Sequence, residues 1–293
     1  MAKPRRPKAL LRRLSLLMLM LMLMLVFMFG VPAQAYHLPK WELGVGVAAL
    51  NLPAYRGARG SENHLLPFPY VVYRGERLRA DEEGIRTKLI DRSRFRLDLS
   101  LAGNLPVKDT DVEARRGMPE LDPIGEIGPT LDWSLWRSIL PDNNADVELW
   151  LRSPLRAAFS VGDPLLAHRG WVFSPSLDLV YRRGSARHLQ RWALSMGPLY
   201  ATQDFHRYFY EVSPAFVTPT RNEYHASGGY SGARITLSFT IYREDWFFGG
   251  FARYDDLSHA VFIDSPLVET DSFFALGLAV SRVFKVSGQK LPH

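Results

Sequence analysis

The chain has 293 residues, of which 47% are hydrophobic and 23% charged, and it contains no cysteine. This composition is too apolar for a disordered protein, and the length suffices for one large domain or two small ones. The formal net charge is +6, from 36 Lys and Arg against 30 Asp and Glu, but six basic residues and no acidic ones lie in residues 1–35. The remaining 30 basic residues balance the 30 acidic ones, so the main argument for nucleic-acid binding disappears, and we expect no nucleic-acid partner.

Residues 1–35 have the three parts of a secretory signal peptide. A basic segment runs to Arg13, an apolar run extends from Leu14 to Phe29, and Ala33-Gln34-Ala35 supplies small residues for a signal peptidase. The alternative is an uncleaved membrane anchor, but the apolar run is shorter than the roughly 20 residues that span a bilayer. We therefore expect cleavage after Ala35, leaving residues 36–293 as the mature chain.

An exported chain without cysteine cannot be held by disulfides, so its stability must come from its own packing or from lipid. After Ala35 no stretch approaches 18 uninterrupted apolar residues, and the sequence predicts no second transmembrane helix.

Apolar residues of the mature chain recur with a period of two. Phe95, Leu97, Leu99 and Leu101 alternate with polar or small residues, which places them on one face of a strand but on opposite sides of a helix. The same alternation covers 235–241, 131–135, 147–151, 177–181, 192–196 and 274–280, and weaker strand signals begin at Trp41, Leu65, Ile85, Tyr208 and Trp246. The pattern predicts an all-β chain.

Turn-forming clusters separate the strand-like runs, at residues 74–76, 91–93, 141–144 and 183–185. Longer polar connections are expected at 103–122 and 255–271. No composition shift or linker divides residues 36–293, so we predict a single domain.

Two all-β architectures fit this alternation: a soluble sandwich with its apolar face inward, and an outer-membrane barrel with that face toward lipid. Three features favour the barrel. The runs are about 9–11 residues long, small residues oppose bulky ones, and aromatic residues sit at run ends (Trp171 and Tyr181, Tyr242 and Trp246, Tyr70 and Tyr73). We predict a closed antiparallel transmembrane β-barrel of about twelve strands, with ten as the alternative.

Three groups of residues carry a family resemblance. Near the start of the mature chain are Pro53-x-Tyr55-x-Gly57 and, after it, Leu66-Pro67-Phe68-Pro69-Tyr70. The middle contains Gly117-Met118-Pro119-x-Leu121-Asp122-Pro123, and the segment near the end is Asp264-Ser265-Pro266-Leu267-Val268. In this order they resemble the MipA/OmpV family of outer-membrane proteins. The resemblance implies an outer-membrane β-barrel and, for the founding member of the family, a scaffolding role that holds a murein hydrolase near a murein synthase. One departure is the polar tail after Phe284, because outer-membrane barrels usually end on an aromatic residue.

His225 and Ser227 form the best enzymatic candidate. Residues two apart on a strand point the same way, so the imidazole could reach the hydroxyl, as in outer-membrane lipid hydrolases. No orienting acid is identifiable, and the alternative is an ordinary strand end with a solvated histidine. We expect no catalytic residues.

The other candidate sites are weaker. Gly44-x-Gly46 lacks the third glycine and the helix of a dinucleotide site. The eight histidines are scattered, and Asp255-Asp256 is a single doublet that is more often solvated than bound to calcium. We expect no metal and no cofactor.

Charged residues also fall on the polar face of the strand-like runs, where a barrel would turn them into its lumen. They are Arg94, Arg96, Asp98, Asp132, Glu148, Arg152, Asp178, Arg182, Arg191 and Arg234. One interpretation is a mixed-sign ladder that fills and stiffens the interior, and the other is a selective pore; a twelve-stranded barrel is too narrow for a general porin.

The residue pattern predicts a protein of the cell outer membrane in contact with outer-membrane lipid, and the resemblance implies a non-enzymatic scaffold linked to peptidoglycan maintenance. The first alternative is a narrow channel and the second is a lipid hydrolase at His225 and Ser227.

Overall fold

The computed structural model describes residues 40–75, 78–81, 84–92, 94–108, 112–140, 144–184 and 188–286. The predicted signal peptide and the tail beyond Val286 lie outside these residues. The strands are β1 (Trp41–Leu52), β2 (Glu62–Arg74), β3 (Leu78–Asp81), β4 (Gly84–Arg92), β5 (Phe95–Asn104), β6 (Ile124–Leu140), β7 (Ala145–Ser160), β8 (Ala167–Phe173), β9 (Ser176–Arg183), β10 (Gln190–Ala201), β11 (Gly229–Arg243), β12 (Trp246–Asp256) and β13 (Ser272–Val286). The helical elements are α2 (Gln203–Tyr210) and the 3-10 turns η1 (Glu113–Arg115) and η4 (Pro214–Phe216).

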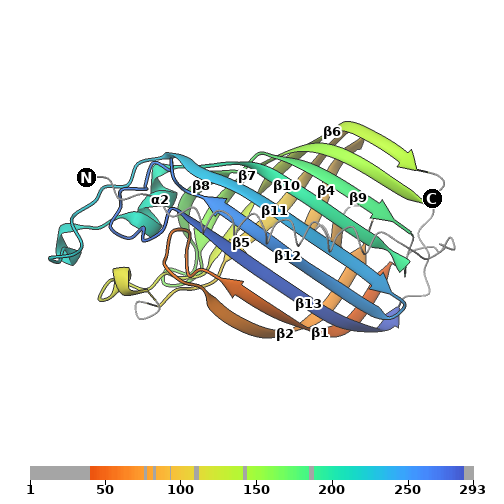
Figure 1. Ribbon diagram of the computed structural model, residues 1–293, viewed down its shortest axis with the longest axis horizontal. Coiled ribbons are helices and arrows are strands. Elements are labelled where there is room, and N and C mark those ends of the chain that lie inside the picture. Colours follow the sequence, from red (N-terminus) through yellow and green to blue (C-terminus); the bar gives the residue numbers. More distant parts are fainter. Residues whose placement is uncertain are drawn as a thin grey trace, which may run out of the picture. The chain divides into compact units, whose positions relative to one another are not determined.

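The strand pairings run in a closed ring. Each strand pairs antiparallel with its neighbours, β1 meets β13, and β10 meets β11. β8 and β9 both pair with β7 and with β10, so they are two parts of one strand interrupted at Ser174 and Pro175. The described residues therefore form a closed antiparallel barrel of twelve strands, as the sequence predicted (Figure 1).

Alternation along the strands places apolar side chains outside and polar ones inside. On β6, Trp133 and Leu135 are exposed, whereas Thr130 and Asp132 keep only 4% and 2% of their surface. A sandwich would bury the first pair and expose the second. The predicted orientation, with the apolar face toward lipid and the charged face toward the lumen, is confirmed.

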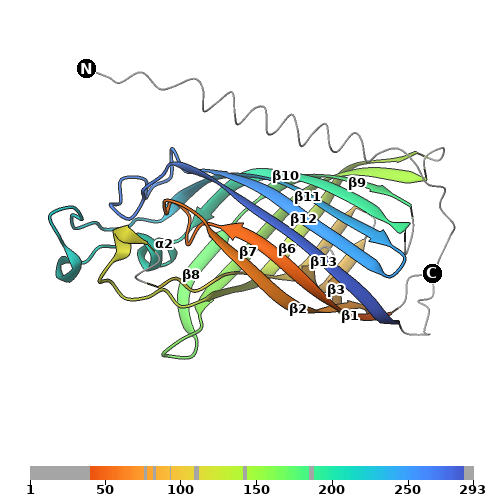
Figure 2. The same cartoon turned by 60° about the horizontal axis from the view of Figure 1, so that its bottom comes forward.

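The two ends of the barrel differ in their connections. The long segments 53–61, 105–123, 202–228 and 257–271 all follow strands that run to the same end, which we call the loop end (Figures 1 and 2). At the other end, which we call the short-turn end, the strand bounds leave connections of two to six residues. Outer-membrane barrels have short periplasmic turns and longer extracellular loops, so the short-turn end faces the periplasm. Among the described residues, no helix has the length and apolarity to cross a membrane.

Outward aromatic residues form a belt at each end, as amphipathic rings do at membrane interfaces. Trp41 packs on Tyr73 at 4.1 Å at the short-turn end, and Tyr254 packs on Phe274 at 4.9 Å at the loop end. The expectation that Tyr70 and Tyr242 belong to these belts is wrong. Both are buried and point inward, and the Tyr70 hydroxyl donates to that of Tyr242 at 2.9 Å.

One edge of β2 has no strand partner over most of its length. The strand pairs with β1 throughout, but it meets β3 only at Tyr73 and Arg74 among the described residues. The Arg74 N–H donates to Lys40 on the β1 side, so N–H groups of alternate residues starting at Tyr73 point to the other edge. Pro67 and Pro69 fall in that alternate set. Because proline has no N–H, they remove hydrogen-bond donors from the open edge, which is a common way to prevent an edge strand from pairing with another chain.

Two details of the predicted elements need correction. Several strands exceed 11 residues: β6 has 17 and β7 has 16, because their pairing continues from the short-turn end to the start of the long loops. The strand signal at Tyr208 is wrong, since α2 covers it. In that helix His206, Phe209 and Tyr210 recur at helical spacing and are buried.

Candidate functional site

A ladder of ion pairs crosses the inner face of the barrel from β5 to β9. Arg96, Asp132 and Arg152 lie directly opposite one another on β5, β6 and β7. Arg152 donates to Asp132 at 3.1 and 3.3 Å and lies 3.5 Å from Asp178 on β9. Opposite charges in neighbouring cross-strand positions offset the cost of taking each one out of water.

Most of the other predicted lumen charges are ion-paired or buried. Arg182 donates to Glu148 at 2.7 Å and to Asp146 at 3.4 Å. Asp98 and Arg191 are buried on β5 and β10, and Arg234 on β11 is half-buried beside Asp255. Arg94 departs from the prediction: it is exposed in the turn before β5, because the strand begins one residue later.

Sequence reasoning missed two further ion pairs, one of this ladder on β6 and β7 and one outside it on β1 and β2. Arg156 lies 3.3 Å from Glu126, and Arg74 lies 3.1 Å from Glu42, with both partners largely buried. Extending the alternation on β6 backward from Asp132 would have placed Glu126 on the same inward face.

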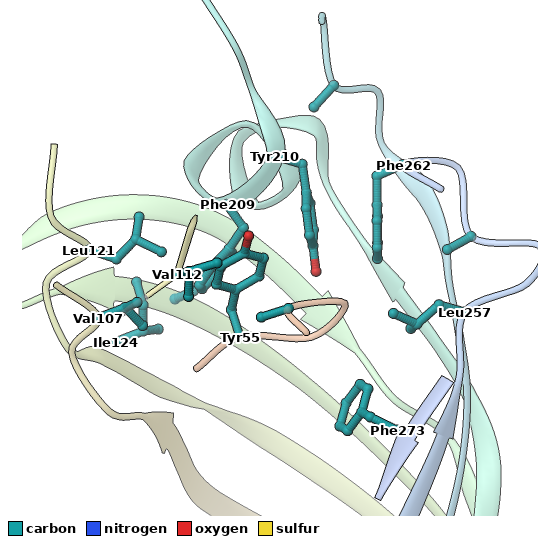
Figure 3. Packing of buried hydrophobic residues seen from close by; sticks show 14 residues of the cluster. Tyr55, Val107, Val112, Leu121, Ile124, Phe209, Tyr210, Leu257, Phe262 and Phe273 are labelled. Carbon is teal, nitrogen blue, oxygen red and sulfur yellow. The ribbon is translucent and has the colours of Figure 1, made fainter. Parts of the chain in front are cut away.

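A buried cap closes the loop end. It combines Tyr55 from the β1–β2 segment, Val112 from the β5–β6 segment, Phe209 and Tyr210 from α2, and Phe262 from the β12–β13 segment (Figure 3). Those four segments follow strands spaced around the ring, so one continuous cluster must reach across the mouth. The sequence predicted polar loops at 103–122 and 255–271. Both connections instead contribute residues to the hydrophobic core of the cap.

The family-motif residues meet in this cap. The Tyr55 hydroxyl donates to the Leu267 carbonyl at 2.7 Å, and the Gly57 carbonyl accepts from the Glu269 N–H at 2.8 Å. Ser265 donates to the Tyr210 carbonyl at 2.8 Å, which joins the β12–β13 segment to α2.

Backbone conformation explains the glycine of this motif. Gly57 has a φ of +97°, which an L side chain rarely adopts, and a Cβ there would lie 3.1 Å from Val268. Pro53 directly follows β1, Asp264 is exposed and Pro266 is half-buried. The motif thus defines how two distant segments interlock over the mouth of the barrel.

The structure does not bring His225 and Ser227 together as a catalytic pair. The His225 side chain is 72% exposed, and its ring nitrogens lie 3.1 Å from Glu211 and 3.2 Å from Glu223. Ser227 is also exposed, and its carbonyl accepts a hydrogen bond from His206. Both ring nitrogens therefore face carboxylates instead of the serine hydroxyl.

His206 is the buried histidine of the cap. Its Nδ1 lies 2.6 Å from the Ser227 carbonyl and its Nε2 lies 2.6 Å from the Ser231 hydroxyl. A carbonyl only accepts, so Nδ1 donates and Nε2 accepts from the serine in the neutral form. Burial, aided by nearby Arg56, lowers the pKa of His206.

We predict that acidification loosens the cap. A depressed pKa in the folded state means that the stability contributed by neutral His206 is present above the unfolded pKa of about 6.5 and is lost as the pH falls below it. Hydrogen exchange of α2 should accelerate relative to the barrel strands between pH 7.5 and 5.5, and H206Q should flatten that difference. Exposed His225 has the opposite sign, because hydrogen bonding to Glu211 raises its pKa. If α2 in H206Q still exchanged faster at pH 5.5 than at pH 7.5, relative to the strands, a group other than His206 would be responsible for the loosening of the cap.

Asp255 does not behave as a solvated calcium ligand. It is fully buried at the loop end of β12 and forms ion pairs with arginine side chains, whereas Asp256 accepts from the Ser258 N–H at 2.9 Å. Within the described residues, no group of three or more His, Asp or Glu side chains is arranged to hold a metal ion.

Comparisons with solved structures return barrels at low similarity. The CymD monoaromatic hydrocarbon channel is 12% identical with a TM-score of 0.29, covering 84% of this chain and 89% of that one. The P. putida toluene transporter TodX is 10% identical with a TM-score of 0.27, covering 88% and 68%. The outer membrane protein OprG from Pseudomonas aeruginosa is 10% identical with a TM-score of 0.20, covering 86% and 96%.

A search of curated proteins finds no match to this chain. The profile of the family described as MltA-interacting protein MipA matches residues 45–284, which span β1 to β13. That range includes the whole ring of strands, the cap and the lumen ladder. The chain is an outer-membrane β-barrel protein and belongs to the MltA-interacting protein MipA family.

Proposed function

We propose that this protein is a non-enzymatic scaffold of cell-wall maintenance that holds a murein hydrolase near a murein synthase. The observation that carries the proposal is the family match over residues 45–284, because the family is described as MltA-interacting. The interaction named in that description is the property we transfer to this chain.

The geometry supports a scaffold over a channel. A cap lies across the loop end, and ion pairs such as Arg152 with Asp132 occupy the lumen. A transport protein needs an open path through the lumen, whereas a scaffold needs a rigid fold with a surface that partner proteins can bind. His225 and Ser227, the candidate lipid-hydrolase pair, do not face each other, which supports a non-enzymatic role.

The short-turn end is the surface on which we place the partners, because it faces the periplasm where murein enzymes work. Exposed residues there include Arg92 and Arg94 near the β4–β5 turn and Glu244 in the β11–β12 turn. Charged side chains at a rim mainly set the association rate and its salt dependence.

The test is affinity capture of the tagged protein from detergent-solubilised envelopes, followed by identification of murein enzymes. We expect wild type to recover a murein hydrolase and a murein synthase, and R94E to recover less of both at low salt. R207E is the matched control, because Arg207 is an exposed arginine of α2 at the opposite end.

Recovery of no murein enzyme by wild type would refute the scaffold function. Equal loss in R94E and R207E would refute the assignment of partners to the short-turn end. In planar bilayers, a large steady conductance of wild type would favour the channel instead.

A further inference from the structure

Three arginine side chains converge on one carboxylate beneath the cap. Arg56 of the β1–β2 segment lies 3.0 Å from Asp255, Arg234 of β11 lies 3.1 Å away, and Arg253 of β12 lies 2.9 Å away. Arg234 is directly opposite Asp255 in the β11–β12 pairing. We call these three residues the tri-arginine cluster.

The cluster carries an excess of two positive charges. Among the described residues, Asp255 is the one carboxylate within ion-pair distance of the three arginines, and it is fully buried. The lumen ladder differs, since Arg152 there has two acidic partners and Arg156 has its own glutamate. Like charges crowded in a poorly solvated site repel one another, so the surplus is costly without a counter-ion.

Two guanidinium nitrogens of the cluster are buried without a hydrogen bond to any described residue. They are Arg253 Nε, which lies 2.9 Å from Asp255, and Arg56 Nη2. Gly232 lies against it: a Cβ at that position would be 3.3 Å from Arg56 Nη2. A buried donor that lacks a partner is rare in folded proteins and commonly marks a ligand-binding or other functional role.

The three arginines keep part of their surface exposed on the inner side of the barrel. The side chains of Arg56, Arg234 and Arg253 keep 19%, 32% and 24% of their surface exposed, although Asp255 keeps none. On β12 the alternation places Arg253 and Asp255 on the inner face, with Tyr254 packed outside against Phe274. The barrel wall therefore separates the cluster from lipid headgroups outside.

We propose that the tri-arginine cluster is a binding site for a small soluble oxyanion of the phosphate or carboxylate class. Guanidinium forks match the oxygen pairs of such anions and form charge-assisted hydrogen bonds with them. One anion of charge −2 would neutralise the surplus. Since Arg56 belongs to the cap and the Tyr210 hydroxyl donates to its carbonyl at 2.9 Å, the bound anion would also fasten the cap to β11 and β12.

The experiment measures unfolding of the full-length barrel in neutral detergent with inorganic phosphate or chloride at matched ionic strength. We expect phosphate to stabilise wild type in a saturable way, as a ligand of the native state does. R234Q and R253Q should weaken the apparent phosphate affinity about tenfold or more. R156Q is the matched control, an inward arginine of the ladder whose loss should leave the phosphate response intact.

Substitution of the carboxylate separates a binding site from a structural ion pair. D255N raises the surplus charge, so any folded D255N should bind phosphate more tightly than wild type. If D255N does not fold, the wild-type, R234Q and R156Q responses decide the question. The proposal is overturned if phosphate and chloride act alike on wild type, if R234Q keeps the full response, or if micelles containing phosphatidylglycerol reproduce it without free phosphate.

Discussion

Replacing Asp132 with alanine should destabilise the barrel by about 3 kcal/mol, the lower end of the range for breaking a buried ion pair. Asp132 retains 2% of its surface and accepts two hydrogen bonds from Arg152, with Arg96 at 3.9 Å on the other side. Its loss leaves two arginines facing each other in the lumen. We expect a loss of stability at the lower end of this range because Arg152 retains a second ion-pair partner, Asp178, at 3.5 Å.

The measurement is urea unfolding of D132A in lipid vesicles, followed by tryptophan fluorescence. D146A is the matched control, because Asp146 also pairs with an arginine, Arg182 at 3.4 Å, but is 25% exposed. Its loss should cost about 1 kcal/mol or less. If both variants lost the same stability, the ladder would be no more than a set of solvated charges.

Replacing Phe262 with alanine should open the cap, at a local cost of about 3–5 kcal/mol for a fully buried ring. Phe262 stacks on Tyr210 at 3.8 Å and meets the edge of His206 at 4.8 Å. Together with the hydrogen bond from Ser265 to the Tyr210 carbonyl, this stacking holds the β12–β13 segment against α2. Loss of the Phe262 ring leaves a cavity that the surrounding loops cannot fill without moving.

Hydrogen exchange of α2 in F262A should rise while the strands stay protected, and planar-bilayer traces should gain openings that wild type lacks. V261A is the control: Val261 is the neighbouring residue, 37% exposed, and its truncation should matter little. Uniform loss of protection across strands and loops would mean that the cap is not a separate unit of stability.

Period-two alternation predicted the strands, and run length, small residues opposite bulky ones and aromatic run ends then favoured the barrel over a sandwich, because lipid and lumen impose opposite chemistry on successive residues. Phe95 to Leu101 and Ile235 to Ile241 lie in strands as expected, and the count of twelve followed from length. Whether a side chain points into the lumen or toward lipid is harder to predict near strand ends, where bulges shift the pairing register between neighbouring strands. A bulge at Ser134 to Trp136 leaves both Leu135 and Trp136 exposed, although a regular strand would turn one of them inward.

The cap and the tri-arginine cluster could not be predicted from local pattern. Tyr55 and Leu267 are 212 residues apart, and Arg56 and Asp255 are 199 apart, so each contact depends on how the ring closes. The motif residues at 53–57 and 264–266 supplied the one available signal, but nothing in their spacing showed that they touch. α2 was missed because its aromatic residues also fit a short strand.

The central claim is that apolar side chains face lipid and polar ones face the lumen, and site-directed spin labelling tests it directly. Because the chain has no cysteine, each introduced cysteine is unique. Neighbouring positions form matched pairs: Leu101 with Ser100, Met196 with Ser195, and Ile235 with Thr236, the first of each being exposed and the second half-buried.

In reconstituted bilayers, nitroxides at 101, 196 and 235 should be relaxed by dissolved oxygen, which concentrates in lipid. Those at 100, 195 and 236 should respond to a water-soluble nickel reagent instead. Labels at 101, 196 and 235 that are shielded from both reagents would place these side chains in a dry protein interior and contradict the barrel.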